Sequence, residues 1–281
     1  MRVLKIILCV VTALSIAAFA LAIYYTQFYK DVVPPKIQMD ADTVTVSVAD
    51  GDEALLQGVT ATDNRDGDIT KTIIVDDVSQ LTGANSAQVR YIVFDKAENY
   101  AIASRTVVYS DYEKPRIIIL KPLVFDIGQT VALRGKVFAR DCLEGNITST
   151  IRLSSQDLNN KAAGTYHLTI WAMNRLGDVA TVDVPVIIRE ENPAAPVVEL
   201  NTYLVYLERG AEFDPEEYFD VCYETGTSRT RRSYSQLDVT HAVDTETPGT
   251  YEVTYAATNR DGLTSEVILT VIVEDNMEGQ S

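Results

Sequence analysis

The sequence of 281 residues predicts an all-β protein in which three tandem antiparallel β-sandwiches follow one transmembrane helix. One long apolar segment lies near the N-terminus, apolar and polar residues alternate through the rest of the chain, and a set of motifs recurs roughly every 80 residues. We therefore divide the chain into a transmembrane signal-anchor (1–30), three domains (31–110, 111–191 and 192–275) and a disordered polar tail (276–281).

The apolar segment is long enough to span a membrane. Residues 6–23 form a run of 18 residues, and only Thr12 and Ser15 are mildly polar. At ~1.5 Å per residue the run extends ~27 Å, close to the ~30 Å hydrocarbon core of a bilayer. Aromatic residues follow at once, as in the interfacial belt of membrane helices. The sequence therefore predicts contact with the membrane over residues 6–25.

The charges beside this segment set its orientation. Arg2 and Lys5 precede it, so the positive-inside rule predicts a cytoplasmic N-terminus, one pass through the cell membrane and an extracellular C-terminus. Small residues near Ala20 and Ala22 also fit a signal peptidase site, which leaves open secretion after cleavage. Because the apolar run continues to Tyr25, beyond the usual length of a signal-peptide core, we favour an uncleaved anchor.

The charge outside the membrane argues against nucleic acid as a partner. Residues 1–30 hold three basic residues and no acid, so the remainder has 21 basic against 40 acidic residues, a net charge of −19. Such a surface repels a phosphate backbone. Cys142 and Cys222 are the only cysteines after the helix and fall in different domains. No disulfide within a domain is therefore possible, and core packing must hold each domain together.

Within each domain the hydrophobic pattern has a period of two. Valines at 44, 46 and 48 alternate with polar residues, and Tyr166, Leu168 and Ile170 share one strand face. This alternation indicates strands with one face in a core and one in water. Short strands with turn signals every 8–12 residues favour an immunoglobulin-like topology. One helical turn is expected at residues 214–217, where an N-cap aspartate precedes proline and two acids.

The recurring motifs resemble a known repeat. Ala-x-Asp leading into Asp-Gly-Asp-Ile-Thr (61–70) returns at 139–148, and Gly-Thr-Tyr at 164–166 returns at 249–251. The pattern over residues 34–275 resembles the bacterial immunoglobulin-like repeat of pesticidal crystal proteins and many surface proteins, which is similar to the hyalin-type repeat. The resemblance implies three tandem copies that act as spacers, adhesion modules or carbohydrate-proximal accessories of Gram-positive bacteria, without catalysis.

An acidic turn in the first domain is a candidate calcium site. Asp63, Asp66 and Asp68 lie close together in the sequence, and Ca²⁺ prefers several oxygen ligands in a flexible turn. The spacing is not that of an EF-hand, since Ile73 stands where the last glutamate would be. An Asx-type turn that only joins two strands is the alternative. Apart from calcium here, we expect no cofactor.

Two further features are candidate ligand-binding residues. Arg229, Arg231 and Arg232 form a basic run in an acidic ectodomain, and arginine presents a fork that grips carboxylate or sulfate. The alternative is a loop with solvated charges. Simple alternation exposes Trp171 on the face opposite Ile170, where it could stack on a sugar or contact a protein. Packing under a loop or a neighbouring domain is its alternative.

The sequence offers no catalytic constellation. His167 and His241 lie in different domains, without cysteine or acid at the spacing of metal ligands, and we expect no enzyme activity. We expect a membrane-anchored bacterial cell-surface protein that presents a rod of immunoglobulin-like domains for adhesion or for binding a surface protein or carbohydrate. The alternative is a passive spacer or envelope-assembly subunit without a ligand. An exposed aromatic or basic patch on the third domain would favour binding, and uniformly polar faces would favour the spacer.

Overall fold

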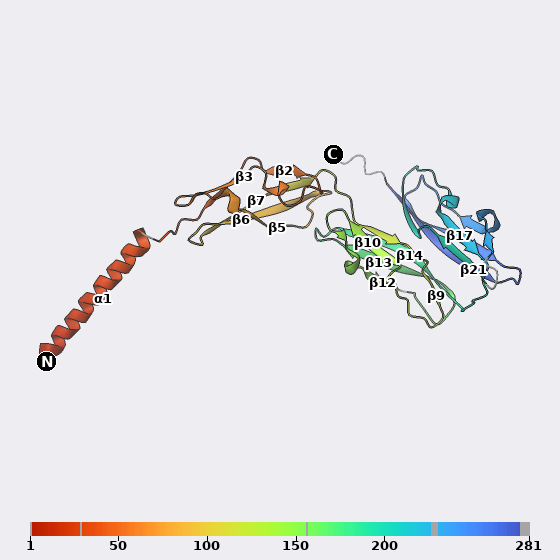
Figure 1. Cartoon of the computed structure of the whole chain (residues 1–281), viewed down its shortest axis with the longest axis horizontal. Helices are drawn as coiled ribbons and strands as arrows, with labels where there is room; N and C mark the ends of the chain where they lie inside the picture. Colours follow the sequence, from red (N-terminus) through yellow and green to blue (C-terminus); the bar gives the residue numbers. More distant parts are fainter. Residues whose placement is uncertain (1, 29, 156, 226–229, 276–281) are drawn as a thin grey trace. The chain divides into compact units, whose positions relative to one another are not determined.

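The structure is a computed structural model that describes residues 2–28, 30–155, 157–225 and 230–275. One helix, α1 (Arg2–Phe28), precedes three β-sandwiches (Figure 1). The predicted tail at 276–281 lies outside the described residues.

The helix has the composition of a membrane span. Its segment Val3–Tyr25 is long and apolar enough to cross a membrane, and none of it is buried. The hydroxyl of Thr12 donates to the carbonyl oxygens of Leu8 and Cys9, both at 3.0 Å. This polar group is therefore satisfied within the helix, as hydrocarbon surroundings require.

Each sandwich packs a three-stranded sheet on a four-stranded sheet, and all three have the same strand order. In the first sandwich the sheets are β1 (Lys36–Met39), β3 (Val59–Asp63) and β4 (Gly67–Asp68), and β2 (Thr43–Val46), β7 (Tyr100–Tyr109), β6 (Ser86–Phe94) and β5 (Ile74–Val78). In the second they are β8 (Arg116–Ile119), β10 (Val137–Asp141) and β11 (Gly145–Asn146), and β9 (Val124–Asp126), β14 (Val179–Arg189), β13 (Gly164–Met173) and β12 (Arg152–Ser154). In the third they are β15 (Val197–Leu200), β17 (Phe219–Tyr223) and β18 (Arg231–Arg232), and β16 (Leu204–Glu208), β21 (Thr264–Glu274), β20 (Gly249–Thr258) and β19 (Asp238–His241).

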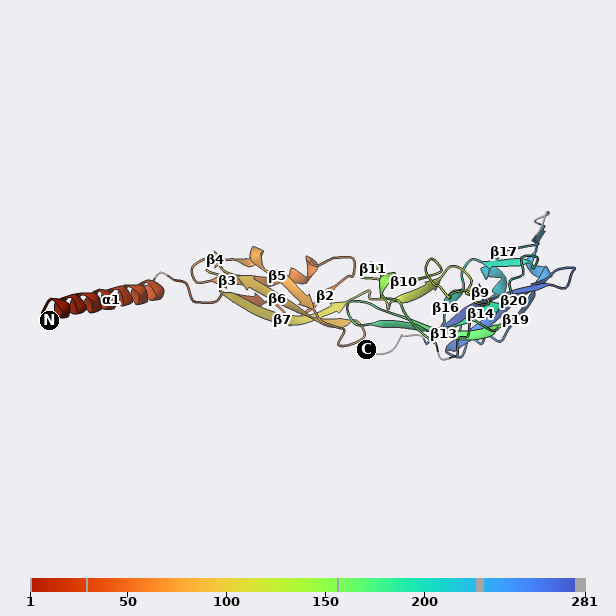
Figure 2. The same ribbon diagram turned by 90° about the horizontal axis from the view of Figure 1, so that it is seen from below.

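One strand pair in each sandwich is parallel, although the sequence pointed to antiparallel strands. The second strand of each sandwich runs parallel to the last, as β2 does beside β7, and the other pairs in the sheets are antiparallel. The chain crosses from the three-stranded sheet to the four-stranded sheet between the first and second strands of each sandwich. The second strand therefore joins the edge of the other sheet and pairs with the last strand. Figure 2 shows β5, β6 and β7 side by side in the larger sheet of the first sandwich.

The predicted alternation and the predicted helical turn are both confirmed. Leu168 and Ile170 are buried on β13, whereas His167, which directly precedes Leu168, is exposed. A short 3₁₀ helix spans Pro215–Tyr218, and the Asp214 carboxylate caps it by accepting the N–H of Glu216 at 2.9 Å.

The chain divides into two compact units, residues 1–112 and 113–281. The first unit contains α1 and the first sandwich. Its core encloses one arginine: Arg105 is 3% exposed, and its guanidinium donates to the Tyr91 hydroxyl at 2.8 Å and to the carbonyl oxygens of Leu55 and Gln57. These bonds satisfy a buried charge that would otherwise be costly.

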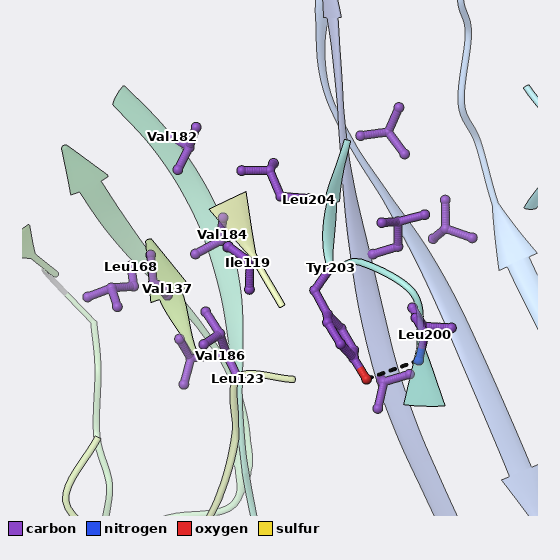
Figure 3. Packing of buried hydrophobic residues seen from close by; sticks show 14 of the residues in the cluster. Ile119, Leu123, Val137, Leu168, Val182, Val184, Val186, Leu200, Tyr203 and Leu204 are labelled. Atoms are coloured by element: carbon purple, nitrogen blue, oxygen red, sulfur yellow. Dashed lines mark hydrogen bonds between the residues drawn. The ribbon is translucent and has the colours of Figure 1, made fainter. Parts of the chain in front are cut away.

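The second unit contains the second and third sandwiches, which share one hydrophobic cluster. Figure 3 shows Leu200, Tyr203 and Leu204 of the third sandwich beside Ile119 and Leu123 of the second. A shared core means that these two sandwiches are coupled by apolar burial. The predicted boundaries of 31–110, 111–191 and 192–275 stay predictions.

Polar contacts reinforce this junction. The N–H of Tyr203 donates to the Ile119 carbonyl oxygen at 2.9 Å, and the Tyr206 hydroxyl donates to the Ile117 carbonyl oxygen at 3.3 Å. Arg116 lies over the Tyr206 ring at 4.4 Å and pairs with Glu274 at 2.8 Å. Burial raises the pKa of Tyr203 to about 12, so this phenol stays neutral in the core.

Candidate functional site

Three carboxylates converge at one end of the first sandwich. Asp31, Asp63 and Asp95 each place an oxygen within 4.8 Å of the other two. All three residues are more than nine-tenths buried, with exposed fractions of 8%, 8% and 7%. We refer to Asp31, Asp63 and Asp95 as the carboxylate cluster.

The three members come from distant parts of the chain. Asp31 lies in the segment between α1 and β1, Asp63 is the last residue of β3, and Asp95 begins the turn after β6. Asn99, at the other end of that turn, donates its side-chain N–H to Asp95 Oδ2 at 2.7 Å and to the Asp31 carbonyl oxygen at 3.4 Å. The turn therefore holds the chain after the helix against the sandwich.

One oxygen of the cluster has no hydrogen-bond partner. Asp63 Oδ1 accepts the N–H groups of Arg65 and Asp66 at 2.8 and 2.9 Å, whereas Asp63 Oδ2 is buried and unpartnered. The N–H of Asp66 and then that of Arg65 lower the pKa of Asp63. The Asp63 carboxyl group is therefore ionised at neutral pH, with one buried oxygen unpaired.

The other two residues of the predicted calcium turn lie outside this cluster. Asp66 accepts the N–H of Lys96 at 2.8 Å and pairs with its ammonium group at 3.0 Å, and these contacts lower the pKa of Asp66. Asp68 accepts the N–H of Thr70 at 2.9 Å, and hydrogen bonding with Thr70 lowers its pKa. Of the predicted trio, the structure brings only Asp63 into the cluster, together with Asp31 and Asp95. Sequence reasoning missed those two because they are remote in the chain.

Two members of the predicted basic run, Arg231 and Arg232, lie among the described residues. Arg232 is half-buried, paired with Glu224, and donates to the Thr258 carbonyl oxygen at 2.8 Å. Arg231 is exposed on β18. Arg229 lies outside the described residues.

Trp171 is half-buried on the outer face of the second sandwich. It lies opposite Arg152 on one neighbouring strand and Thr181 on the other. Its indole is thus accessible in part, and its role in binding stays a prediction.

An apolar surface that the sequence analysis missed covers the outer face of the first sandwich. Ile74, Ile92 and Ile102 are direct neighbours on β5, β6 and β7, and Phe94 pairs with Tyr100. Exposed fractions are 52% for Ile74, 47% for Phe94, 57% for Tyr100 and 53% for Ile102. These five residues form the first-sandwich patch. The period of two marks this face only as non-core, so its apolar residues were not recognised as a surface.

The same positions in the other sandwiches are more polar. In the second sandwich, the residues at the equivalent positions of the sheet are Arg152, Trp171, Thr181, Met173 and Val179. In the third sandwich, the residues at these positions are Asp238, Ala256, Glu266, Thr258 and Thr264. The patch is therefore a property of the first sandwich and not of the fold.

A small pocket of about 180 Å³ lies at the junction of the second and third sandwiches. Prolines 122, 193 and 196 and several valines line it, and Arg189 is its one titratable lining residue. These lining residues include no acid or base that could exchange protons with a substrate.

Comparison with known proteins finds a family match in the third sandwich. The family model for the bacterial surface protein Ig-like domain matches residues 203–273. The chain is 25% identical over 219 residues to the pesticidal crystal protein Cry22Aa of Bacillus thuringiensis, a match that covers 76% of this chain and 29% of that protein. The chain thus spans less than a third of the length of this relative.

Two solved structures show a weak overall similarity to the chain. The M60 catalytic domain of Clostridium perfringens ZmpB with its carbohydrate-binding modules shows 11% identity and a TM-score of 0.25, over 88% of this chain and 31% of that one. A structure of protocadherin gammaB7 shows 13% identity and a TM-score of 0.21, over 86% of this chain and 74% of that one. The sheets themselves make the chain an all-β protein of immunoglobulin-like sandwiches, and its third sandwich matches the family model of a bacterial surface Ig-like domain over residues 203–273.

Proposed function

We propose that the chain is a non-enzymatic, membrane-anchored bacterial surface protein that binds a protein partner through the outer face of its first sandwich. The observation that carries this proposal is the first-sandwich patch. Monomeric soluble proteins rarely leave a contiguous apolar surface of this kind exposed, and such surfaces mark interaction sites.

Retention of the helix is part of the proposal. The apolar span Val3–Tyr25, none of it buried, and the basic Arg2 and Lys5 at its N-terminal end support a single-pass anchor with the sandwiches outside. The alternative is cleavage near Ala20 or Ala22. The common strand order of the sandwiches supports their origin as three copies of one repeat.

The position of the patch favours a partner held at the same membrane. Phe94 and Tyr100 flank the turn that carries Asp95, and this turn contacts Asp31. Asp31 lies six residues after Tyr25, the end of the apolar span, so an extended chain places the carboxylate cluster within about 20 Å of that end. The patch is therefore close to the membrane.

The chemistry of the patch favours protein over carbohydrate. Isoleucine side chains contribute three of its five members and offer no hydrogen bonds to sugar hydroxyls. Aromatic and aliphatic anchors in one contiguous surface are typical of protein contacts. The Trp171 face, beside Arg152, is the more suitable surface for a carbohydrate.

Crosslinking in intact producing cells tests the binding proposal. The full chain is compared with a variant carrying Phe94→Ser and Tyr100→Ser, and with a control carrying Met173→Ser and Val179→Ser, the equivalent exposed positions of the second sandwich. We expect a discrete crosslinked species that falls about tenfold in the patch variant, since hot-spot residues contribute about 1.4 kcal/mol or more. The control should match the wild type. Equal crosslinking in all three proteins would contradict the patch as the binding surface, and the absence of a crosslinked species in the wild type would favour the passive spacer.

A further inference from the structure

The carboxylate cluster concentrates negative charge where solvent screens it poorly. Asp31, Asp63 and Asp95 are each more than nine-tenths buried, and a buried charge is retained when it is paired or binds a metal. Arg65 is one nearby cation: its Nε lies 3.7 Å from Asp31 Oδ2, but its side chain is 44% exposed. Among the described residues, this half-exposed guanidinium offsets only part of the charge of three carboxylates.

The second sandwich shows how the same position is satisfied by protein groups. Asp141 ends β10 as Asp63 ends β3, and its Oδ1 likewise accepts two N–H groups of the following turn. Its Oδ2, however, accepts the side-chain N–H of Asn174 at 2.9 Å. Asn174 follows β13 as Asp95 follows β6, so an amide donor in the second sandwich is replaced by a third acid in the first.

The third sandwich uses a cation of its own. Glu224 follows β17 at the same end of the sandwich, and the Arg232 guanidinium binds it. In the second and third sandwiches, a side chain of the protein thus donates to the carboxylate at this end. In the first, Asp63 Oδ2 is buried without a hydrogen-bond partner.

We propose that the carboxylate cluster binds a divalent cation of the calcium class through oxygens of Asp31, Asp63 and Asp95. Two oxygens on opposite sides of a Ca²⁺ ion lie about 5 Å apart, and the three cluster oxygens lie within 4.8 Å of one another. Carboxylates are the ligands that Ca²⁺ prefers, and remaining positions can be taken by water or carbonyl oxygens. The unpaired oxygen of Asp63 becomes a ligand.

This cation would fasten the membrane anchor to the first sandwich. Asp31 belongs to the segment after α1, whereas Asp63 and Asp95 belong to the sandwich. A shared ion makes release of that segment depend on extracellular calcium. The inference does not depend on the first-sandwich patch, so either can fail without the other.

Calcium titration of the full chain in nanodiscs tests the inference. Isothermal calorimetry should show one site, with a dissociation constant of about 0.1–1 mM as in extracellular modules. Asp95→Asn, which installs the residue pair of the second sandwich, and Asp31→Ala should each weaken binding at least about tenfold, because ligand charge sets affinity. Asp66→Asn and Asp68→Asn, outside the cluster, are the controls and should bind as the wild type does.

Trypsin cleavage provides a second readout that reports the position of the segment. Calcium should slow cleavage after Lys30, next to Asp31, in the wild type and leave it unchanged in Asp31→Ala, a change in the linker that spares the sandwich core. Absence of a calcium effect on both readouts would overturn the proposal. So would loss of binding in the Asp66 and Asp68 variants with retention in Asp95→Asn, since that would place the ion in the acidic turn.

Discussion

At the scale of single residues, the turn beside the carboxylate cluster is strained. Glu98 has a φ of 66°, and it is the one non-glycine residue with positive φ in the described chain. The corresponding turns of the other sandwiches have Gly177 and Gly262 there, with φ of 77° and 79°. A side chain in the left-handed region costs on the order of 1 kcal/mol or more, so the first sandwich carries strain that the others avoid.

Replacing Glu98 with glycine should therefore stabilise the first sandwich. We expect Glu98→Gly to raise its free energy of unfolding by about 0.5–1 kcal/mol, after the entropic cost of glycine in the unfolded chain. Denaturant unfolding of the full chain, followed by a probe in the first sandwich, measures this. The reciprocal control, Gly177→Glu, should destabilise the second unit by a similar amount. A destabilised Glu98→Gly variant would show that contacts of the glutamate outweigh its backbone strain.

At the scale of strands and sheets, the sequence predicted the fold well because its signals are local. The alternation of Tyr166, Leu168 and Ile170, and the Asp214–Pro215 cap, each depend on neighbouring residues. The parallel pairing of β2 with β7 and the joining of two cores could not be predicted this way, since both depend on which distant segments meet.

The residues of the candidate site also divide into those with a local sequence signal and those that only folding brings together. Asp63 was found because it lies in a conspicuous acidic turn. Asp31 and Asp95 were missed because folding alone brings them to it, from 32 residues away on each side. Arg232, predicted to bind a ligand, is occupied by Glu224 eight residues earlier, a pairing set by the antiparallel register of β17 and β18.

The shared core predicts that the second and third sandwiches unfold together. Tyr203 is 4% exposed and contacts both sandwiches, so Tyr203→Ala should cost about 3–5 kcal/mol and separate their common transition into two. Calorimetry of the full chain measures this. Leu55→Ala, in the core of the first sandwich, is the matched control and should shift only the transition of the first unit. A single undivided transition of the second unit in Tyr203→Ala would contradict the coupling.

At the scale of the whole molecule, an apolar helix is followed by acidic sandwiches, the first of which carries the proposed binding surface and the proposed cation site. The net charge of −19 after residue 30 keeps the sandwiches soluble and away from anionic lipid. The patch and the carboxylate cluster both lie in the first unit, which also contains the helix. Action of both at the cell membrane requires that the helix stays attached.

External protease treatment of intact producing cells, followed by mass spectrometry of the membrane fraction, tests that requirement most directly. We expect that peptides from residues 31–275 are released into the medium, while a fragment that retains residues 2–28 stays with the membrane. Recovery of untreated protein from the medium with an N-terminus just after Ala20 or Ala22 would contradict the anchor, and protection of the sandwiches from protease would contradict their exposure at the cell surface.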